Sequence, residues 1–263
     1  MKRVYLSADD FGRSKERNRA IDESFKSGLI KSAGLIVTGQ YLPDAVKLIN
    51  EGGYVRHIHC HFNLSGNLKG EDSMDRPITE KMKKDKMFCD NGLFRSYSGL
   101  PSNLSSIVKS FVVYKELVAQ FNKFVEVTNG EGNLRHIDFH LWYNLTLPVS
   151  IALNLFTWTH RIKSVRYIGV NKEHSKRRFI RLLSWNPFIK SFRSSNIDGF
   201  LSKPEWFEKD KTIELYCHPD YMNGNLDILM DNSISYFGHK KKTLLEHIDM
   251  LKQYDIEFVS WGQ

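Results

Sequence analysis

The sequence predicts an α/β fold, a deformed (β/α) barrel of mainly parallel strands that forms a single domain over residues 1–263. Three observations support this prediction. Short apolar segments alternate with amphipathic segments along the whole chain, as strands alternate with crossover helices. The chain has 263 residues, 41% of them hydrophobic, so it can bury one large core, and no repeat or linker divides it. Carboxylates and histidines stand where apolar segments end, as the carboxyl ends of barrel strands would present them.

The amino-terminal half follows this alternation from its first residues. The helix predicted at 14–28 has a signal at both ends, because Ser14 is a favoured N-cap and Gly28 a favoured stop. A long segment from 66 to 105 then separates the third strand from the next helix. In this half we predict strands at 3–8, 34–39, 57–66 and 134–144, and helices at 14–28, 42–53 and 114–130.

The carboxyl-terminal half continues the pattern around a basic and aromatic segment, residues 172–195. We predict a helix after Pro148, strands at 162–169, 211–219 and 256–261, and a final helix at 241–253. About seven strand signals with no second core favour a barrel that is closed or nearly closed.

Composition narrows the class of protein. The net charge of +8 would suit nucleic acid, an anionic membrane or an acidic substrate, but no helix-turn-helix, zinc-finger or RNA-recognition pattern is present, so we expect no nucleic-acid partner. The spacing of Cys60, Cys89 and Cys217 fits neither a disulfide framework nor a metal clip, which favours free thiols in a reducing compartment. Because we see no signal-peptide pattern and no long apolar run, the expected location is cytoplasmic.

The stretch "RHIHCHFNLSG" carries histidines at alternate positions, His57, His59 and His61. In an extended chain the three imidazoles would share one face at intervals of about 6.6 Å. That spacing is too wide for one tetrahedral ion unless other segments supply ligands. The stretch is therefore either structural or one part of a larger site.

Asp9 and Asp10 directly follow the first predicted strand. Two adjacent carboxylates repel each other unless something positive holds them, and a divalent cation would do so. One aspartate would then bind the ion while the other serves as general base toward metal-bound water. The alternative is that they form the N-cap of the helix that follows.

The strand predicted at 134–144 places Asp138, His140, Trp142 and Asn144 on one face, by the same alternation. Trp142 is either a core residue or a platform on which a sugar ring stacks. The strand thus presents a carboxylate, an imidazole, an indole and an amide to one cavity.

His218 ends a later strand directly before Pro219, which cannot continue a central ladder and so fixes the exit of the chain. Taken alone, it could equally be an ordinary histidine. Cys60 and Cys217 precede His61 and His218, so alternation turns both thiols away from the proposed site, where they would act as small apolar fillers.

These motifs together resemble those of a known family. The segments "LSADDFG", "CHFNLSG", "ELVAQFNKF" followed by "HIDFH", "VRY" and "ELYCHPD" occur in the order and at the intervals found in the YdjC-like carbohydrate deacetylase family. Its members include chitooligosaccharide deacetylases and enzymes of hopanoid-lipid processing. The resemblance runs from residue 3 to about residue 220, and "ADDFG" is its most specific element.

The resemblance implies a metal-dependent hydrolase that removes acetyl groups from amino sugars. Carried over by position, the metal ligands are Asp10, His61 and His140, the general base is Asp9, the general acid is His218, and Arg166 lies near the substrate or the base. Two imidazoles and one carboxylate suit zinc or magnesium, and also nickel, cobalt or manganese.

Some positions depart from the family pattern. The family motif is D-x-H-x-H-x-H, and this sequence has Trp142 and Asn144 where the motif has its last two histidines. His59 stands where glycine is common in the family. We expect Trp142, Asn144 and Asn63 to bind the substrate. These departures concern which sugar is bound more than which reaction occurs.

Within the basic and aromatic segment, residues 176–193 are predicted to form either a helical lid over the pocket or a contact with an anionic membrane. The membrane contact would suit a lipid-linked sugar substrate.

The main functional hypothesis is a cytoplasmic carbohydrate deacetylase with a divalent metal ion. A second is a glycan-binding relative with little or no catalysis, and a third is hydrolysis of another ester or phosphoester. Retention of both the base and the acid favours the enzyme. The sugar, the acetyl position and the oligomeric state, a homodimer included, stay open.

Overall fold

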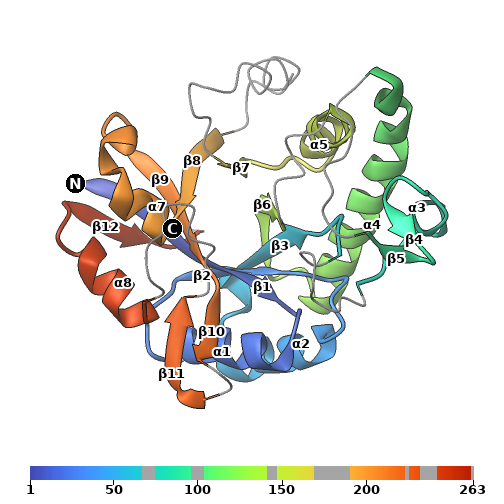
Figure 1. Ribbon diagram of the computed structural model, residues 1–263. Helices are drawn as coiled ribbons and strands as arrows, with labels where there is room; N and C mark the ends of the chain where they lie inside the picture. The colour runs from blue at the N-terminus through green and yellow to red at the C-terminus, as the bar shows by residue number, and fades with distance from the viewer. Residues whose placement is uncertain are drawn as a thin grey trace.

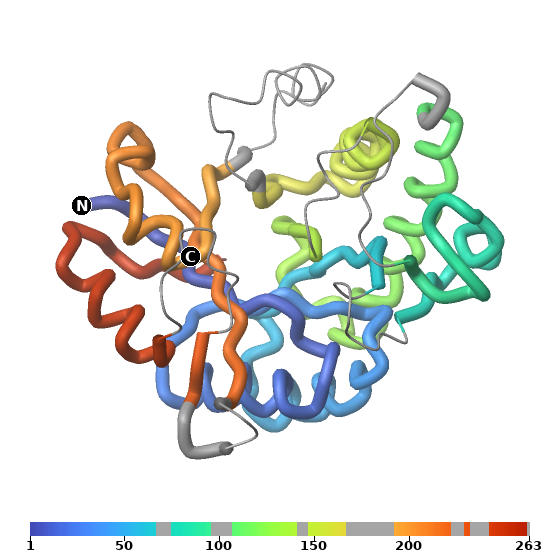
Figure 2. Tube along the Cα trace, viewed as in Figure 1, coloured from blue at the N-terminus to red at the C-terminus, as the bar shows by residue number. Residues whose placement is uncertain are grey.

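The computed structural model describes residues 1–66, 75–95, 104–140, 147–168, 190–222, 225–231 and 242–261, which form one α/β domain (Figure 1 and Figure 2). Within these residues, eight parallel strands make one sheet. Around the sheet they are β12 (Ile256–Val259), β1 (Lys2–Phe11), β2 (Ser32–Leu35), β3 (Ile58–Phe62), β6 (Asn133–Phe139), β7 (Ser164–Ile168), β8 (Lys190–Asn196) and β9 (Thr212–Cys217).

The sheet closes on itself because β9 pairs with β1, from Arg3 opposite Thr212 to Ala8 opposite Cys217. Strand β12 lies beside the amino-terminal half of β1. The predicted parallel barrel in a single α/β domain is confirmed.

Helices cover the outside of the barrel (Figure 1). They are α1 (Lys15–Lys26), α2 (Leu42–Gly52), α4 (Ser110–Val127), α5 (Leu147–Thr159), α7 (Ile197–Ser202) and α8 (Leu244–Leu251). Shorter elements are η1 (Val55–His57), α3 (Glu80–Lys83), η2 (Leu104–Lys109), η4 (Pro204–Phe207) and the strand pairs β4 (Cys89–Asp90) with β5 (Leu93–Phe94) and β10 (Pro219–Met222) with β11 (Asn225–Asp231). None of the helices in the described part of the chain is both long and apolar enough to cross a membrane.

Local sequence explains where several helices begin. Ser14 is the N-cap of α1, and its side chain accepts a hydrogen bond from the Arg17 N–H at 3.1 Å, as predicted from the sequence. Helix α8 begins with a capping box in which Thr243 and Glu246 satisfy each other's backbone N–H groups. Because Ser14 caps α1, neither aspartate of the preceding pair is needed as a cap.

Alternation along the strands separates an apolar outer face from a polar inner face. In β3, Ile58, Cys60 and Phe62 are fully buried in the core between sheet and helices, while His59 and His61 take the other face. The same period holds in β1, β6, β7 and β9, so the inner face is rich in ionisable groups. Its polar residues include Ser7, Asp9, His59, His61, His136, Asp138, Arg166 and Glu214.

Aromatic rings fill the amino-terminal end of the barrel interior. Trp261 stacks on Tyr5 with ring centroids 3.8 Å apart, and on His136 at the same distance. Phe192 of β8 packs against this cluster. Apolar packing at one end therefore leaves the polar groups gathered toward the carboxyl ends of the strands.

Some elements differ from their predictions. Strand β3 begins at Ile58, one residue later than predicted, and His57 lies in the turn η1, so only two of the three alternate histidines share the strand. Strand β2 begins two residues earlier than predicted, at Ser32. The hairpin β10–β11 was not predicted.

The prediction that residues 176–193 form a lid or a membrane contact is wrong for the last four of them. Residues 190–193 belong to β8, a strand of the barrel wall, rather than to a lid or a membrane contact. This placement follows because β8 pairs with β7 and β9. Phe192 also packs beside Tyr5, with ring centroids 5.6 Å apart. Residues 176–189 lie outside the described residues.

Candidate active site

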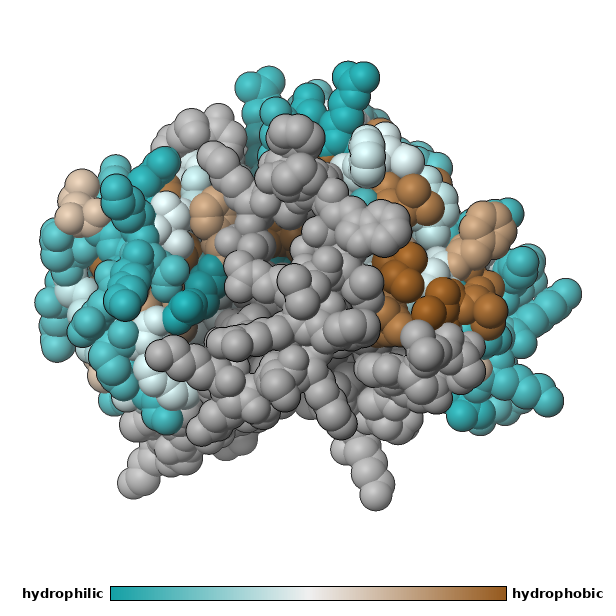
Figure 3. Space-filling model, turned by 90° about the horizontal axis from the view of Figure 1, so that it is seen from above, coloured by the Kyte–Doolittle hydropathy of each residue, from teal (hydrophilic) through white to brown (hydrophobic). Residues whose placement is uncertain are grey.

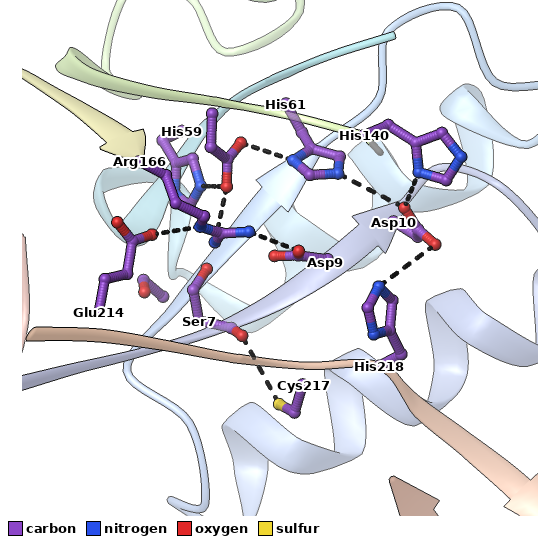
Figure 4. Close-up of polar contacts among 12 residues, drawn as sticks. Ser7, Asp9, Asp10, His59, His61, His140, Arg166, Glu214, Cys217 and His218 are labelled. Carbon is purple, nitrogen blue, oxygen red and sulfur yellow. Dashed lines mark hydrogen bonds and ion pairs between the residues drawn. The ribbon is translucent and has the colours of Figure 1, made fainter. Parts of the chain in front are cut away.

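Asp10 lies at the centre of a buried cluster at the carboxyl ends of the strands (Figure 4). Its Oδ1 is 2.7 Å from Nδ1 of His140 and 3.5 Å from Nε2 of His61. Its Oδ2 accepts a hydrogen bond from Arg13 at 2.9 Å. Oδ1 therefore faces His61 and His140, and Oδ2 faces Arg13.

A bulge at the end of β1 brings both aspartates to the same site. Adjacent residues of a strand normally face opposite ways, so Asp10 should point outward where Asp9 points inward. Between Ala8 and Phe11 the pairing with β2 shifts register, and Asp10 has a φ of 70°, in the left-handed region. This strained backbone returns the Asp10 side chain to the inner side, beside Asp9.

Asp10, His61 and His140 fit a metal ion. Each offers one ligand atom, and the three atoms lie within 4.8 Å of one another. Nε2 of His61 is buried and has no hydrogen-bond partner among the described residues, although an imidazole nitrogen in such a place is costly unless something binds it. Bonds of about 2.0–2.2 Å to a shared ion would require ligand atoms spaced much as these are.

Asp138 sets the orientation of His61. Its Oδ1 is 2.5 Å from Nδ1 of His61, and its Oδ2 is 2.9 Å from Nε2 of His59. With Nδ1 held in this way, Nε2 of His61 points toward Asp10. A carboxylate behind a metal-binding histidine is the usual arrangement that fixes such a ligand.

Two further groups of histidine and carboxylate side chains within the described residues have a similar spacing, and both include Asp138. Arg166 lies against that carboxylate, with its terminal nitrogen 2.6 Å from Oδ2. The carboxylate that both groups share is thus neutralised by a buried guanidinium, whereas Asp10 keeps Oδ1 toward two imidazoles, so the cluster around Asp10 is the better metal site.

Arg166 joins three buried carboxylates (Figure 4). Besides Asp138, it contacts Asp9 Oδ2 at 2.5 Å and Glu214 Oε1 at 2.7 Å. Burial lowers the pKa of Arg166, but Asp138, Asp9 and Glu214 outweigh this and raise its pKa well above the ordinary value. Asp9 is thereby fixed through one oxygen, while its Oδ1 is buried and has no hydrogen-bond partner in the part of the chain that the structure describes.

The charges within the cluster keep its acids ionised. Burial raises the pKa of Asp10, but His140 and Arg13 outweigh this and hold it well below its usual range. For His61, burial lowers the pKa, but Asp138, Asp9 and Asp10 raise it to about 10. The site therefore favours a positive charge between Asp10 and Asp138.

His218 approaches from the far side of Asp10. It follows β9, its side chain is 23% exposed, and its Nε2 is 3.9 Å from Asp10 Oδ2. Burial lowers the pKa of His218, and the nearby Asp10 and Asp9 oppose this shift. Of the described side chains around Asp10, it is the one that combines an imidazole with access to solvent.

Comparison with known proteins shows the family to which the chain belongs. A family model described as YdjC-like protein matches residues 3–240. The chain belongs to the YdjC-like family.

Relatives of this YdjC-like protein carry names that describe their activity. A carbohydrate deacetylase of Clostridium beijerinckii is 24% identical over 266 residues, and the match covers 98% of each chain. A carbohydrate deacetylase of Danio rerio is 28% identical over 140 residues, which is 53% of this chain and 40% of the fish protein. This chain thus spans less than half the length of that vertebrate relative.

A solved structure supports the fold of the YdjC-like chain. A candidate cellobiose-phosphate cleavage protein of Enterococcus faecalis superposes with a TM-score of 0.66 at 18% identity. The likeness covers 84% of this chain and 82% of that one. It shows a shared fold.

The structure brings together most of the site residues predicted for this YdjC-like protein. Asp9, Asp10, His61, His140, Arg166 and His218 all lie within the cluster. Trp142 and Asn144 lie outside the described residues.

Asn63 has a different environment. It is fully buried, and its side-chain amide donates to Asp75 at 2.7 Å and to Thr38 at 3.3 Å. Gln120 pairs with its backbone N–H and C=O at 3.0 and 2.7 Å. These bonds hold the turn after β3, and contact of Asn63 with substrate stays a prediction.

Two further residues contact the predicted site residues of this YdjC-like protein but were not assigned a role from the sequence. Asp138 orients His61, and Glu214 holds Arg166. Both carry a signal in the sequence, because Asp138 stands two positions before His140 and Glu214 four positions before His218, on the same face of each strand.

Proposed function

We propose that this YdjC-like protein is a metal-dependent carbohydrate deacetylase that hydrolyses the acetamide of an N-acetylated sugar. The observation that carries the proposal is the convergence of three ligand atoms, one partly unpaired carboxylate and one accessible imidazole around Asp10. The names of the relatives support the same reaction class.

Asp10, His61 and His140 would hold a divalent ion, zinc or magnesium being the first candidates. When bound, such an ion supplies Lewis acidity, which acidifies a water and polarises an acetyl carbonyl. Asp138 and Arg13 keep two of the ligands in orientation.

Asp9 is proposed as the general base. Arg166 fixes its Oδ2, and its Oδ1 is the buried oxygen without a partner in the structure. This oxygen takes the proton of the water whose oxygen attacks the acetyl carbon. A base held by a guanidinium remains aimed, as proton abstraction requires.

His218 is proposed as the general acid. When the bond between the acetyl carbon and the sugar nitrogen breaks, the nitrogen must gain a proton before it leaves as an amine. The imidazole lies on the opposite side of Asp10 from His61 and is open to solvent, so it can reach a leaving group and recover its proton from water.

Several finer points belong to the proposal. A cytoplasmic location is proposed from the sequence alone, and a lipid-linked form of the sugar is one of the alternatives to a free oligosaccharide. Trp142 and Asn144 are proposed to select the sugar.

The test is acetate release from a panel of N-acetylated oligosaccharides and lipid-linked sugars. Asp9→Asn is expected to lower the rate by about 100-fold or more, because general base catalysis contributes that much, while metal content measured by mass spectrometry stays unchanged. Chelator treatment should abolish release, and added metal should restore it.

Asp85→Asn is the matched control, since Asp85 is another buried aspartate that is paired with a cation, Lys109, at 2.6 Å. It should retain the wild-type rate. If wild type binds metal and glycan but releases no acetate from any member of the panel, the protein is a glycan-binding relative instead.

A further inference from the structure

A second buried cluster of ionisable groups lies behind His218, outside the barrel interior. It consists of Asp231 at the end of β11, His247 in α8 and Asp198 in α7. All three residues are buried, with exposed fractions of 2%, 1% and 5%. The cluster reaches His218 through Asp231.

Asp231 binds the backbone of His218. Its Oδ1 accepts a hydrogen bond from the His218 N–H at 3.0 Å. In the hairpin, Asp231 stands opposite Pro219, which has no N–H to offer the ladder. The side chain of Asp231 therefore takes the N–H of the preceding residue, at the point where β9 ends and β10 begins.

His247 lies between Asp231 and Asp198, on the outer side of Asp231. Nε2 of His247 is 2.9 Å from Asp198 Oδ1, and its Nδ1 is 3.5 Å from Asp231 Oδ2. The imidazole thus stands between two carboxylates that come from different segments. It joins the hairpin that begins after His218 to helices α7 and α8 on the outside of the barrel.

This arrangement bears on the proton transfer, because His218 is a single residue between two strands. General acid catalysis requires the donor atom to lie within hydrogen-bond reach of the leaving group. A displacement of about 1 Å can lower a rate by about 100-fold. A charge-assisted hydrogen bond to the backbone of the acid is a direct way to prevent such a displacement.

We propose that Asp231, held by His247 and Asp198, is the positioning residue for His218. The proposal rests on the proposed function, in which His218 protonates the leaving amine. Asp231 acts on the acid through the hydrogen bond that it accepts from the His218 backbone N–H.

A double-mutant cycle tests the coupling. Asp231→Ala is expected to lower kcat for acetate release about tenfold or more with KM within about twofold, because only the acid moves. In the His218→Asn background the same change should lower kcat by less than about twofold, since no acid remains to be positioned. Asp231→Asn keeps an oxygen acceptor and should stay within about threefold of wild type.

Asp85→Ala is the matched control, because the Asp85 carboxylate also accepts a backbone N–H, that of Met87, at 3.0 Å. It should leave kcat unchanged in both backgrounds. If Asp231→Ala does not fold, His247→Asn removes the support of Asp231 and should show the same dependence on His218. Equal losses of kcat with and without His218 would overturn the proposal.

Amide hydrogen exchange provides a measurement that needs no substrate. In Asp231→Ala, exchange at the His218 amide is expected to be about tenfold faster or more, and Asp85→Ala should match wild type there. Unchanged exchange in Asp231→Ala would refute the positioning role whatever the activity. If exchange in Asp231→Ala is faster but the wild-type protein deacetylates no sugar, the positioning of His218 by Asp231 is supported and the proposed function is rejected.

Discussion

Asp10 shows how one residue can carry several constraints. It is 1% exposed, it has a left-handed backbone, and its two oxygens face different partners. A non-glycine residue with this φ costs of the order of 1 kcal/mol or more, which persists only where surrounding contacts enforce it. Here the enforcing contacts are Arg13 and His140, and strain at such a position is typical of functional sites.

His218 offers a residue-level prediction about leaving groups. Hydrolysis of 4-nitrophenyl acetate releases a phenolate that needs no proton, whereas an amine does. His218→Asn should therefore lower acetate release from the N-acetylated sugar by about 100-fold or more but change ester hydrolysis by less than about threefold. Rates for both substrates, measured on the same preparation, check this.

The metal-loaded His61→Asn variant provides the contrast, because loss of a proposed ligand should lower both rates together. If His218→Asn also lowers both rates equally, His218 is not the general acid.

At the scale of elements, the site depends on close contact between neighbouring strands. Strand β2 contributes no ionisable side chain to the cluster, yet Gly34 lies directly against His61 of β3. A Cβ at position 34 would be 2.9 Å from the His61 Cβ and 3.0 Å from its Nδ1. Glycine at this point in β2 leaves room for the imidazole to reach both Asp138 and Asp10.

Gly34→Ala should therefore displace His61. We expect metal affinity to fall by about 10- to 100-fold, as when a metal-binding histidine loses its supporting partner. Competition with a chromophoric chelator measures this affinity.

Gly28→Ala is the control, since Gly28 has a φ of 73° but open space around its Cβ position. It should lower stability by about 1 kcal/mol without changing metal affinity. Unchanged affinity in Gly34→Ala would show that His61 does not need this space.

At the scale of the whole molecule, the barrel has a polar interior whose charges compensate one another. Arg166 joins three carboxylates from three strands, and Arg13 reaches the fourth. The ring of strands keeps water away from these groups, so unpaired charges there would be costly. At the amino-terminal end of the barrel interior, the His136 imidazole stacks on Trp261.

His136 predicts how stability depends on pH. It is fully buried, and burial lowers its pKa below the ordinary value although Glu214 opposes the shift. The folded protein then binds fewer protons than the unfolded chain, so this contribution to stability is complete above a pH of about 6.5 and is lost as the pH falls below it.

His136→Gln cannot titrate, so its destabilisation relative to wild type should shrink between pH 7 and pH 5, by at most about 1.4 kcal/mol per pH unit. Urea unfolding at several pH values measures it. Val165→Ala, in the apolar core of the next strand, should give a pH-independent loss. A loss for His136→Gln that grows in acid would contradict the prediction.

The sequence by itself determined the barrel, the polar inner faces of its strands and most of the cluster. These follow from alternation, which is a local property of an extended backbone, and from the rule that carboxyl ends of parallel strands meet at one edge. His61, His140 and His218 stand at or near strand ends, but the choice of His61 over His57 and His59 and the role of each histidine came from the family resemblance.

Only the tertiary structure decided that Asp10 turns back beside Asp9 and that Arg166 joins three carboxylates. It also decided that residues 190–193 belong to a strand of the barrel and not to a lid. It also placed Asp231 behind His218. Each of these depends on contacts between segments far apart in the chain, such as Asp9 and Arg166. Local periodicity contains no information about such contacts, because strand register and bulges are fixed by packing across the whole sheet.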